Sequence, residues 1–446
     1  MGGRCLQSRG TTQRLISEPM DDPLVLGIDL GTSGVRVAIL NRQRELLFSQ
    51  ATGYRCSLVH PNDWRDSCAD LIRATPLSLR ARLRALAVDG TSGTLLACDL
   101  SGTPLGPALP YHLACPEQMD TVRTLIQEGP ASVASGSLAR ALRLLAHHPQ
   151  PLMLRHQADW LTGWFLQNWE LGEEGNNLRL GWCLINEQWP ESFERQTWRP
   201  ALPEIRRSGS RLGRVAPSIA AQLGLSEQLE VIAGTTDANA AVLTADAADD
   251  EGITVLGSTL VLKRFSPNPL RSGTGTSTHR VGGRWLAGGA SNCGGAVLQQ
   301  CFPGVDLAEL SRQIDPETDS GLRLVPLTGR GERFPIDAPE LEPVLTPRPV
   351  SDALYLHGLL ESLSRIECLG WERLSELGAP PPQRLVTIGG GAANPQWRRL
   401  RQRLIGIPIR SCSSPPAAGV ARLALTALQQ EREQIEDSRT ESDKLP

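Results

Sequence analysis

The stretch that decides the fold is LVLGIDLGTSGVRVAIL, at residues 24–40. Two apolar runs flank the short segment GTSG, so the pattern predicts two strands joined by a tight turn. Asp29 comes where the first strand ends. Glycines let the backbone approach a ligand closely, and the N–H groups of such a turn can cradle an anion. An ordinary hairpin with an acidic tip explains the same residues, and this stretch alone leaves both interpretations open.

The composition limits the classes of protein to consider. A chain of 446 residues is too long for one ordinary core and predicts two or three domains. A net charge of −3 gives no support for nucleic-acid binding, and the two lysines, Lys263 and Lys444, do not form a GxxxxGKS phosphate loop. No apolar run reaches the ~18 residues of a membrane span. Ten scattered cysteines indicate buried thiols, so we expect a cytoplasmic protein without nucleic-acid or membrane partners.

The opening pattern returns in the second half of the chain. The stretch GITVLGSTLVLKRF, which begins at Gly252, again reads as strand, small-residue turn and strand. Two such hairpins predict a duplicated unit, one in each half. Similar turns follow apolar runs at residues 234–237 and 389–394. Because open α/β sheets bind ligands beyond the carboxyl ends of their strands, the four turns predict two domains that enclose a phosphorylated ligand.

Four stretches, GIDLGTSGVRVAI, GTTDANAA, GITVLGSTL and VTIGGGAANPQWRRL, resemble in this order the motifs of the FGGY carbohydrate kinases. This family belongs to the superfamily of sugar kinases, actin and heat-shock chaperone ATPases. The resemblance implies an α/β fold of two ribonuclease-H-like domains, each on a five-stranded mixed sheet, with a nucleotide- and sugar-binding cleft between them. The expected divisions are a disordered N-terminal extension (1–22), a sugar-binding domain (23–244), a nucleotide-binding domain (245–428) and a disordered tail (429–446).

The resemblance implies two catalytic carboxylates. Asp237 would be the general base that takes the proton of the attacking sugar hydroxyl, and Asp29 would face Mg²⁺ and the reacting end of the sugar. Both roles suit residues that are ionised at pH 7, and Mg²⁺ prefers few protein ligands beside waters and phosphate oxygens. The alternatives are that Asp237 caps a helix and that Asp29 bonds to its own turn. Ser92, in DGTSGT, is the expected further sugar contact.

The resemblance also implies where ATP would lie. Adenosine is expected beside Gly390 and Gly391, where no side chain obstructs a flat base, and beside the amide of Asn394. Trp397 would lie near the adenosine or pack in the core. The terminal phosphates would meet turns from both halves of the chain, formed by Thr32, Ser33, Gly34, Gly257, Ser258 and Thr259. Plain hairpin turns are the alternative for these residues.

The substrate is implied by a narrower likeness. The stretch DGTSGTLLACDLSGTPLGPALPY resembles the short sugar kinases of cyanobacteria and plant plastids, which are xylulose-kinase-like in sequence and associated with D-ribulose. It implies ATP-dependent conversion of D-ribulose to D-ribulose 5-phosphate. Leu113 and Cys115 stand where relatives have an acid and an Arg, and we expect them on the wall of the sugar pocket. This departure keeps two alternatives open, a D-xylulose kinase and a non-catalytic sugar or nucleotide sensor.

Overall fold

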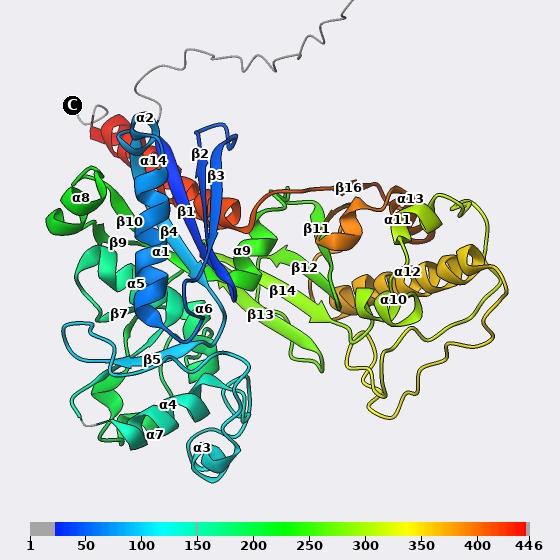
Figure 1. The fold of residues 1–446 in the computed structure, drawn as a ribbon, viewed down its shortest axis with the longest axis horizontal. Coiled ribbons are helices and arrows are strands. Elements are labelled where there is room, and N and C mark those ends of the chain that lie inside the picture. The colour runs from blue at the N-terminus through cyan, green and yellow to red at the C-terminus, as the bar shows by residue number, and fades with distance from the viewer. Residues whose placement is uncertain (1–22, 149, 443–446) are drawn as a thin grey trace, which may run out of the picture.

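The computed structural model describes residues 23–148 and 150–442, so the disorder expected for residues 1–22 and 443–446 lies outside the described residues. Two α/β domains stand side by side, each built on a mixed six-stranded sheet (Figure 1). The expected fold class is confirmed, with one more strand in each sheet than expected. Within the described ranges, no helix is both long enough and apolar enough to cross a bilayer.

The first sheet has the strand order β3-β2-β1-β4-β10-β9. Its strands are β1 (Leu24–Leu30), β2 (Gly34–Leu40), β3 (Leu46–Gly53), β4 (Leu83–Gly90), β9 (Arg211–Arg214) and β10 (Glu230–Thr236). The strands β1, β2 and β3 form the antiparallel meander that the opening stretch predicts. Every residue of β1 is buried, as in strands that are covered on both faces. Because β4 runs parallel to both β1 and β10, the carboxyl ends of these three strands meet at one edge.

The second sheet has the order β13-β14-β12-β11-β15-β16. Its strands are β11 (Glu251–Leu256), β12 (Leu260–Ser266), β13 (Thr276–Val281), β14 (Arg284–Ala290), β15 (Arg384–Ile388) and β16 (Ile409–Ser411). The run β14-β12-β11-β15-β16 has the pairing directions of β3-β2-β1-β4-β10: two antiparallel pairs are followed by two parallel pairs. The internal duplication predicted from the two hairpins is therefore confirmed.

Helices cover the sheets and fill the loops between strands. In the first half they are α1 (Pro61–Ala74), α2 (Leu77–Arg80), α3 (Met119–Leu125), α4 (Ser137–His147), α5 (Gln157–Leu166), α6 (Glu174–Asn177), α7 (Glu191–Glu194), α8 (Pro217–Leu223) and α9 (Asp237–Leu243). In the second half they are α10 (Gly295–Cys301), α11 (Leu307–Ser311), α12 (Asp352–Glu376), α13 (Pro395–Ile405) and α14 (Pro416–Ser442). Two small sheets, β5 (Leu95–Cys98) with β6 (Met153–His156) and β7 (Leu171–Glu173) with β8 (Glu204–Arg206), complete the first half.

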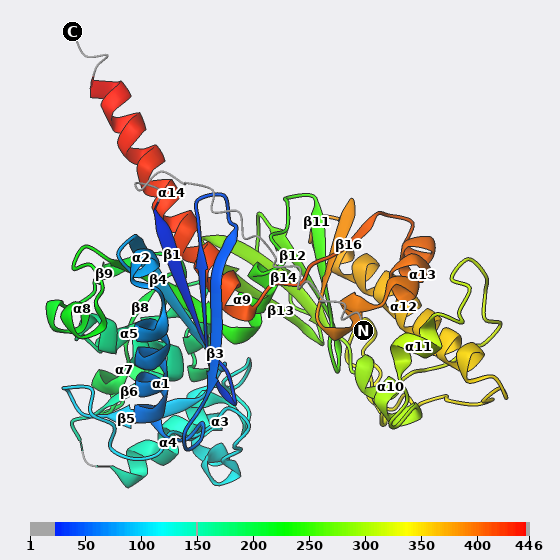
Figure 2. The ribbon, with the colours of Figure 1, turned by 45° about the horizontal axis from the view of Figure 1, so that its top comes forward.

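The last helix packs between the two domains. Helix α14 contacts β1, β2, β4 and α9, and its buried residues share one apolar cluster with residues of both sheets, among them Val25 and Val386 (Figure 2). Small residues allow this close approach: a Cβ added at Gly27 would lie 1.9 Å from the carbonyl oxygen of Ala417, and one at Gly419 would lie 1.9 Å from that of Ala240. The helix also continues to Ser442, so residues 429–442, expected to belong to a disordered tail, are assigned to a helix.

Candidate active site

Three aspartates gather at the edge of the first sheet where β1, β4 and β10 end. Asp29 and Asp89 are direct partners in the register of β1 with β4. Asp237 begins α9 immediately after β10, whose Thr236 is paired with Gly90 of β4. The structure thus brings together Asp29 and Asp237, both expected in the site, and adds Asp89, which the sequence analysis missed. The available signal was that LAVDG ends an apolar run with an aspartate, as LGIDL does.

Asp237 is held by two backbone amides. Its Oδ1 accepts a hydrogen bond from the N–H of Ala238 at 2.9 Å and from the N–H of Ser92 at 3.2 Å. Burial is the largest influence and raises the pKa of Asp237, while these two hydrogen bonds oppose the rise. The N-cap of α9 is Thr236, whose hydroxyl accepts from the N–H of Asn239. The helix-cap role considered for Asp237 therefore belongs to its neighbour.

Asp29 is paired with an arginine from the next strand. Nη1 of Arg36 donates to Oδ2 of Asp29 at 2.9 Å, and the aspartate side chain is only 3% exposed. The two residues are partners in the register of β1 with β2. The carboxylate of Asp29 is thus paired with Arg36. Among the described residues, no backbone N–H of its own turn takes the place of this partner. The same guanidinium lies beside the turn, since a Cβ at Gly31 would approach Nη1 to 2.5 Å.

Asp89 is fully buried between the strand ends. No amide, guanidinium or hydroxyl donor of the described residues reaches either of its carboxyl oxygens. Burial, together with the charge of Asp29, raises the pKa of Asp89 well above its ordinary range. A buried carboxyl group without a hydrogen-bond donor favours its neutral form.

In both predicted phosphate turns the N–H of the leading glycine donates to a carbonyl later in the turn. In the first turn the N–H of Gly31 donates to the carbonyl of Gly34 at 3.0 Å, and the side chains of Thr32 and Ser33 are exposed. A Cβ at Gly34 would lie 2.1 Å from the carbonyl oxygen of Thr52, so this position requires glycine. In the second turn the N–H of Gly257 donates to the carbonyl of Thr259 at 3.2 Å.

The second phosphate turn is also supported from behind by α10. The N–H groups of Gly295 and Ala296 donate to the carbonyls of Gly257 and Ser258 at 2.8 and 3.1 Å. These carbonyls therefore face the helix. Ser258 itself is exposed, as are Thr32 and Ser33 in the first turn.

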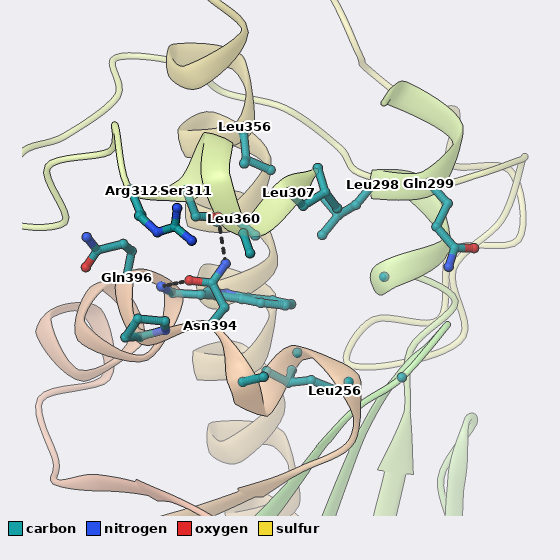
Figure 3. Close-up of a pocket in the computed structure, with 18 of the residues that line it drawn as sticks. Leu256, Leu298, Gln299, Leu307, Ser311, Arg312, Leu356, Leu360, Asn394 and Gln396 are labelled. Carbon is teal, nitrogen blue, oxygen red and sulfur yellow. Dashed lines mark hydrogen bonds between the residues drawn. The ribbon is translucent and has the colours of Figure 1, made fainter. Parts of the chain in front are cut away.

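A cavity of about 620 Å³ opens beside the second turn (Figure 3). Gly257 and Ser258 form part of its wall, and Gly390 and Gly391 form another part. Most of the remaining lining is apolar and comes from β11, α10, α11, α12 and α13, with Leu256, Leu298, Leu307, Leu356, Leu360 and Trp397. A largely apolar cleft with a few polar groups is the usual form of a site for a flat organic ligand.

Asn394 and Trp397 are tied into the protein at the rim of this cavity. Oδ1 of Asn394 accepts from the backbone N–H of Trp397 at 3.0 Å and so caps α13, while Nδ2 donates to Oγ of Ser311 at 2.8 Å (Figure 3). The indole N–H of Trp397 donates to Ser364, and the residue is 4% exposed within the core of the second domain. Trp397 therefore packs in the core and also lines the cavity. The side-chain oxygen of Asn394 caps α13, and its side-chain nitrogen uses one N–H to bind Ser311.

A sequence profile described as the C-terminal domain of the FGGY family of carbohydrate kinases matches residues 252–428. That range contains the second phosphate turn and the whole lining of the cavity. Residues 252–428 therefore belong to the FGGY family of carbohydrate kinases. The protein is therefore an ATP-dependent sugar kinase, and the non-catalytic sensor considered above is set aside.

Distant relatives of this FGGY kinase cover nearly its whole length. It is 22% identical to L-fuculokinase of Escherichia coli (strain K12), over 88% of this chain and 89% of the relative, and 23% identical to xylulose kinase of the same strain, over 93% and 92%. Among solved structures, a xylulose kinase from Brucella ovis aligns with a TM-score of 0.76 at 17% identity, covering 91% of each chain. Plasmodium falciparum glycerol kinase with ADP also gives 0.76, at 16% identity, covering 92% and 90%.

The structure corrects the expected pocket wall of this FGGY kinase. Cys115 is fully buried in an apolar cluster of the first domain, so its side chain does not face a sugar pocket. The carbonyl of Leu113 accepts from Nη1 of Arg140 at 2.7 Å. Arg140, a buried residue of α4, also donates to the carbonyls of Gly93 and Tyr111. An arginine of α4 therefore binds the loop that follows Ser92.

Proposed function

We propose that this FGGY kinase transfers the γ-phosphoryl group of ATP to D-ribulose and forms D-ribulose 5-phosphate. The observation that carries the proposal is the hydrogen bond between the N–H of Ser92 and Oδ1 of Asp237. It joins the aspartate at the start of α9 to the DGTSGT loop, the segment that most resembles the D-ribulose kinases. Asp29 lies near enough for its charge to act on Asp237.

In the proposed reaction the terminal hydroxyl of the sugar attacks the γ-phosphorus atom. The new O–P bond forms as the bond to the leaving ADP breaks, and Asp237 accepts the hydroxyl proton. The backbone amides of Ala238 and Ser92 fix the aspartate so that its free oxygen can face the sugar. The exposed hydroxyls of Thr32 and Ser33 would meet the terminal phosphates, with Gly34 allowing close approach.

The second domain would hold the rest of the nucleotide. We place adenosine in the 620 Å³ cavity beside Gly390 and Gly391, with the phosphates running past Gly257, Ser258 and Thr259. Asn394 and Trp397 would shape the rim and wall rather than read the base through a free amide. The ADP in the similar Plasmodium glycerol kinase structure supports a nucleotide in this fold.

Magnesium would be held mainly by phosphate oxygens and waters. No group of three His, Cys, Asp or Glu suited to a metal occurs among residues 23–148 and 150–442. A Mg²⁺ ion that accompanies a nucleotide needs only one or two carboxylates, and Asp29 at the tip of β1 fits this requirement. The ion would neutralise charge on the phosphates, while Arg36 keeps the carboxylate of Asp29 in place.

D-xylulose is the alternative substrate, favoured by relatives that are named xylulose kinases. A coupled ADP-release assay across D-ribulose, D-xylulose, L-fuculose, pentitols and glycerol decides between them. We expect the highest kcat/KM with D-ribulose. A higher value with D-xylulose would replace the assignment, and no turnover with any of these compounds would reject it.

We propose the cytoplasm as the location, because nine cysteines of the described residues are free thiols, as expected in a reducing compartment.

We expect the enzyme to lose activity in acid at a higher pH than it would if the pKa of its catalytic aspartate were ordinary. The base must be deprotonated to act, and burial raises the pKa of Asp237. Activity should therefore be constant above the raised pKa and should fall as the pH drops through it, above the ordinary value of about 3.9. The measurement is kcat/KM against pH, which reports the free enzyme. An acid limb centred at or below the ordinary aspartate range would contradict the assignment.

Asp29→Asn is expected to lower kcat by about 10²-fold, the size associated with a misplaced reacting group. The amide keeps the shape of the side chain but loses the charge that pairs with Arg36 and faces the metal. Part of the loss should be recovered at high Mg²⁺, which we would measure as kcat against Mg²⁺ concentration. If the variant shows the wild-type Mg²⁺ dependence, Asp29 does not organise the metal.

A further inference from the structure

A continuous set of hydrogen bonds joins the first phosphate turn to the loop that carries Ser92. At one end, Tyr54 spans the turn: its backbone N–H donates to the carbonyl of Ser33 at 3.1 Å, and its hydroxyl donates to the carbonyl of Gly31 at 2.9 Å. The hydroxyl oxygen of Tyr54 in turn accepts from Nε2 of Gln157 at 3.2 Å. Gln157 is the first residue of α5, more than a hundred positions along the chain.

At the other end, Gln157 holds the loop through both its side chain and its backbone. Oε1 accepts from the N–H of Thr91 at 3.0 Å and from its hydroxyl at 2.7 Å. The backbone N–H of Gln157 donates to the carbonyl of Thr94 at 3.1 Å. The next residue after Thr91 is Ser92, whose N–H binds Oδ1 of Asp237. The connection therefore runs from the phosphate turn to the candidate base.

The connection is specific, and it is buried except at Tyr54, which is half-buried. Gln157 is 0% exposed and Thr91 is 2% exposed, and burial raises the pKa of the Tyr54 phenol, so the hydroxyl keeps its proton. The glutamine amide supplies one donor and one acceptor in the directions these partners need. An apolar side chain of the same size would leave the N–H of Thr91 without its acceptor and the hydroxyl of Tyr54 without the donor of Gln157. Loss of a partner is unfavourable for a buried polar group.

We propose that Gln157 and Tyr54 are positioning residues that fix the phosphate turn relative to Ser92 and Asp237. The inference rests on the proposed roles of Asp237 and of the turn at residues 31–34. The two residues form one hydrogen-bonded unit between the turn and the loop. Their joint task is to keep the γ-phosphate and the sugar hydroxyl at reacting distance, where a displacement of about 1 Å lowers the rate by roughly 10²-fold.

The test compares Tyr54→Phe, Gln157→Leu and the double variant with the wild type. The control is Tyr355→Phe in the second domain, which also removes a phenol that donates to a backbone carbonyl, that of Leu345 at 2.9 Å. Steady-state kinetics with the best ketopentose give kcat and the two KM values. Hydrogen exchange of the segment 91–94, followed by mass spectrometry, reports the loop without any turnover.

We expect kcat to fall about 10- to 100-fold in each single variant while KM for ATP stays within about twofold. The double variant should match the more damaged single variant, because both changes break the same connection. The backbone amides of the segment 91–94 should exchange faster in all three variants than in the wild type. In Tyr355→Phe they should exchange at the wild-type rate. Effects on kcat that multiply in the double variant, or unchanged exchange in the single variants, would overturn the proposal. If the wild type phosphorylates no sugar, the proposed function fails, while the exchange data still decide the connection.

Discussion

Asp237→Asn is expected to lower kcat by about 10²–10⁴-fold, the usual contribution of a general base. Asparagine fills the same space and can still accept from the amides of Ala238 and Ser92, but it cannot take a proton at neutral pH. The fold and the cavity proposed for the nucleotide should be unaffected, because the cavity is lined by residues of the second domain. The measurements are kcat from coupled ADP release and ADP affinity by calorimetry.

The matched control for this change is Asp120→Asn. Asp120 lies in the first turn of α3, and its side chain is 100% exposed beside Arg123. This variant should keep wild-type kcat and stability. Wild-type turnover in Asp237→Asn would refute the base, whereas a parallel loss of ADP affinity would indicate a structural rather than a chemical role.

Arg401→Met is expected to destabilise the second domain by about 3–5 kcal/mol, the cost of leaving one partner of a buried ion pair alone. Arg401 of α13 binds Glu367 of α12 through two hydrogen bonds of 2.6 and 2.7 Å, and both side chains are 1% exposed. Its third donor reaches the hydroxyl of Thr387 in β15. Urea unfolding followed by tryptophan fluorescence measures the change.

Two further variants separate the buried charge from simple loss of packing. Arg401→Met combined with Glu367→Met should be more stable than the single variant, because no buried charge is left without a partner. Arg373→Met, on the same α12, breaks an exposed pair with Glu376 and should change the free energy of unfolding by less than about 1 kcal/mol. Equal stability of Arg401→Met and the wild type would mean that the pair contributes nothing.

The sequence was informative where one local pattern determines the structure. The hairpin around Asp29 and its repeat at Gly252 were predictable because strand, glycine turn and strand are encoded by adjacent residues. The convergence of Asp29 and Asp237 followed from parallel strands that end at one edge. Asp89 fits the same rule, yet a lone aspartate after a short apolar run carries no distinctive motif.

Other features depend on partners that are distant in the chain. The burial of Cys115 and the hydrogen bond from Arg140 to Leu113 arise from the packing of α4, which no pattern near residue 115 reveals. Asn394 has the sequence of a ligand-binding turn, but its side chain is engaged by Ser311, 83 residues away. The connection through Gln157 likewise joins residues whose proximity is set by the tertiary fold alone.

The return of α14 to the first sheet has a consequence for synthesis of the chain. The segment that covers β1 and β4 is buried and is translated only after β16; it includes Ala417, Val420, Ala421, Leu423 and Ala424. The second domain, from β11 to β16, is therefore fully translated while the first still has one uncovered face. Domains usually fold in the order of their synthesis. Here the half that begins first is completed last, and nascent chains that stop before residue 416 should present that apolar face to chaperones.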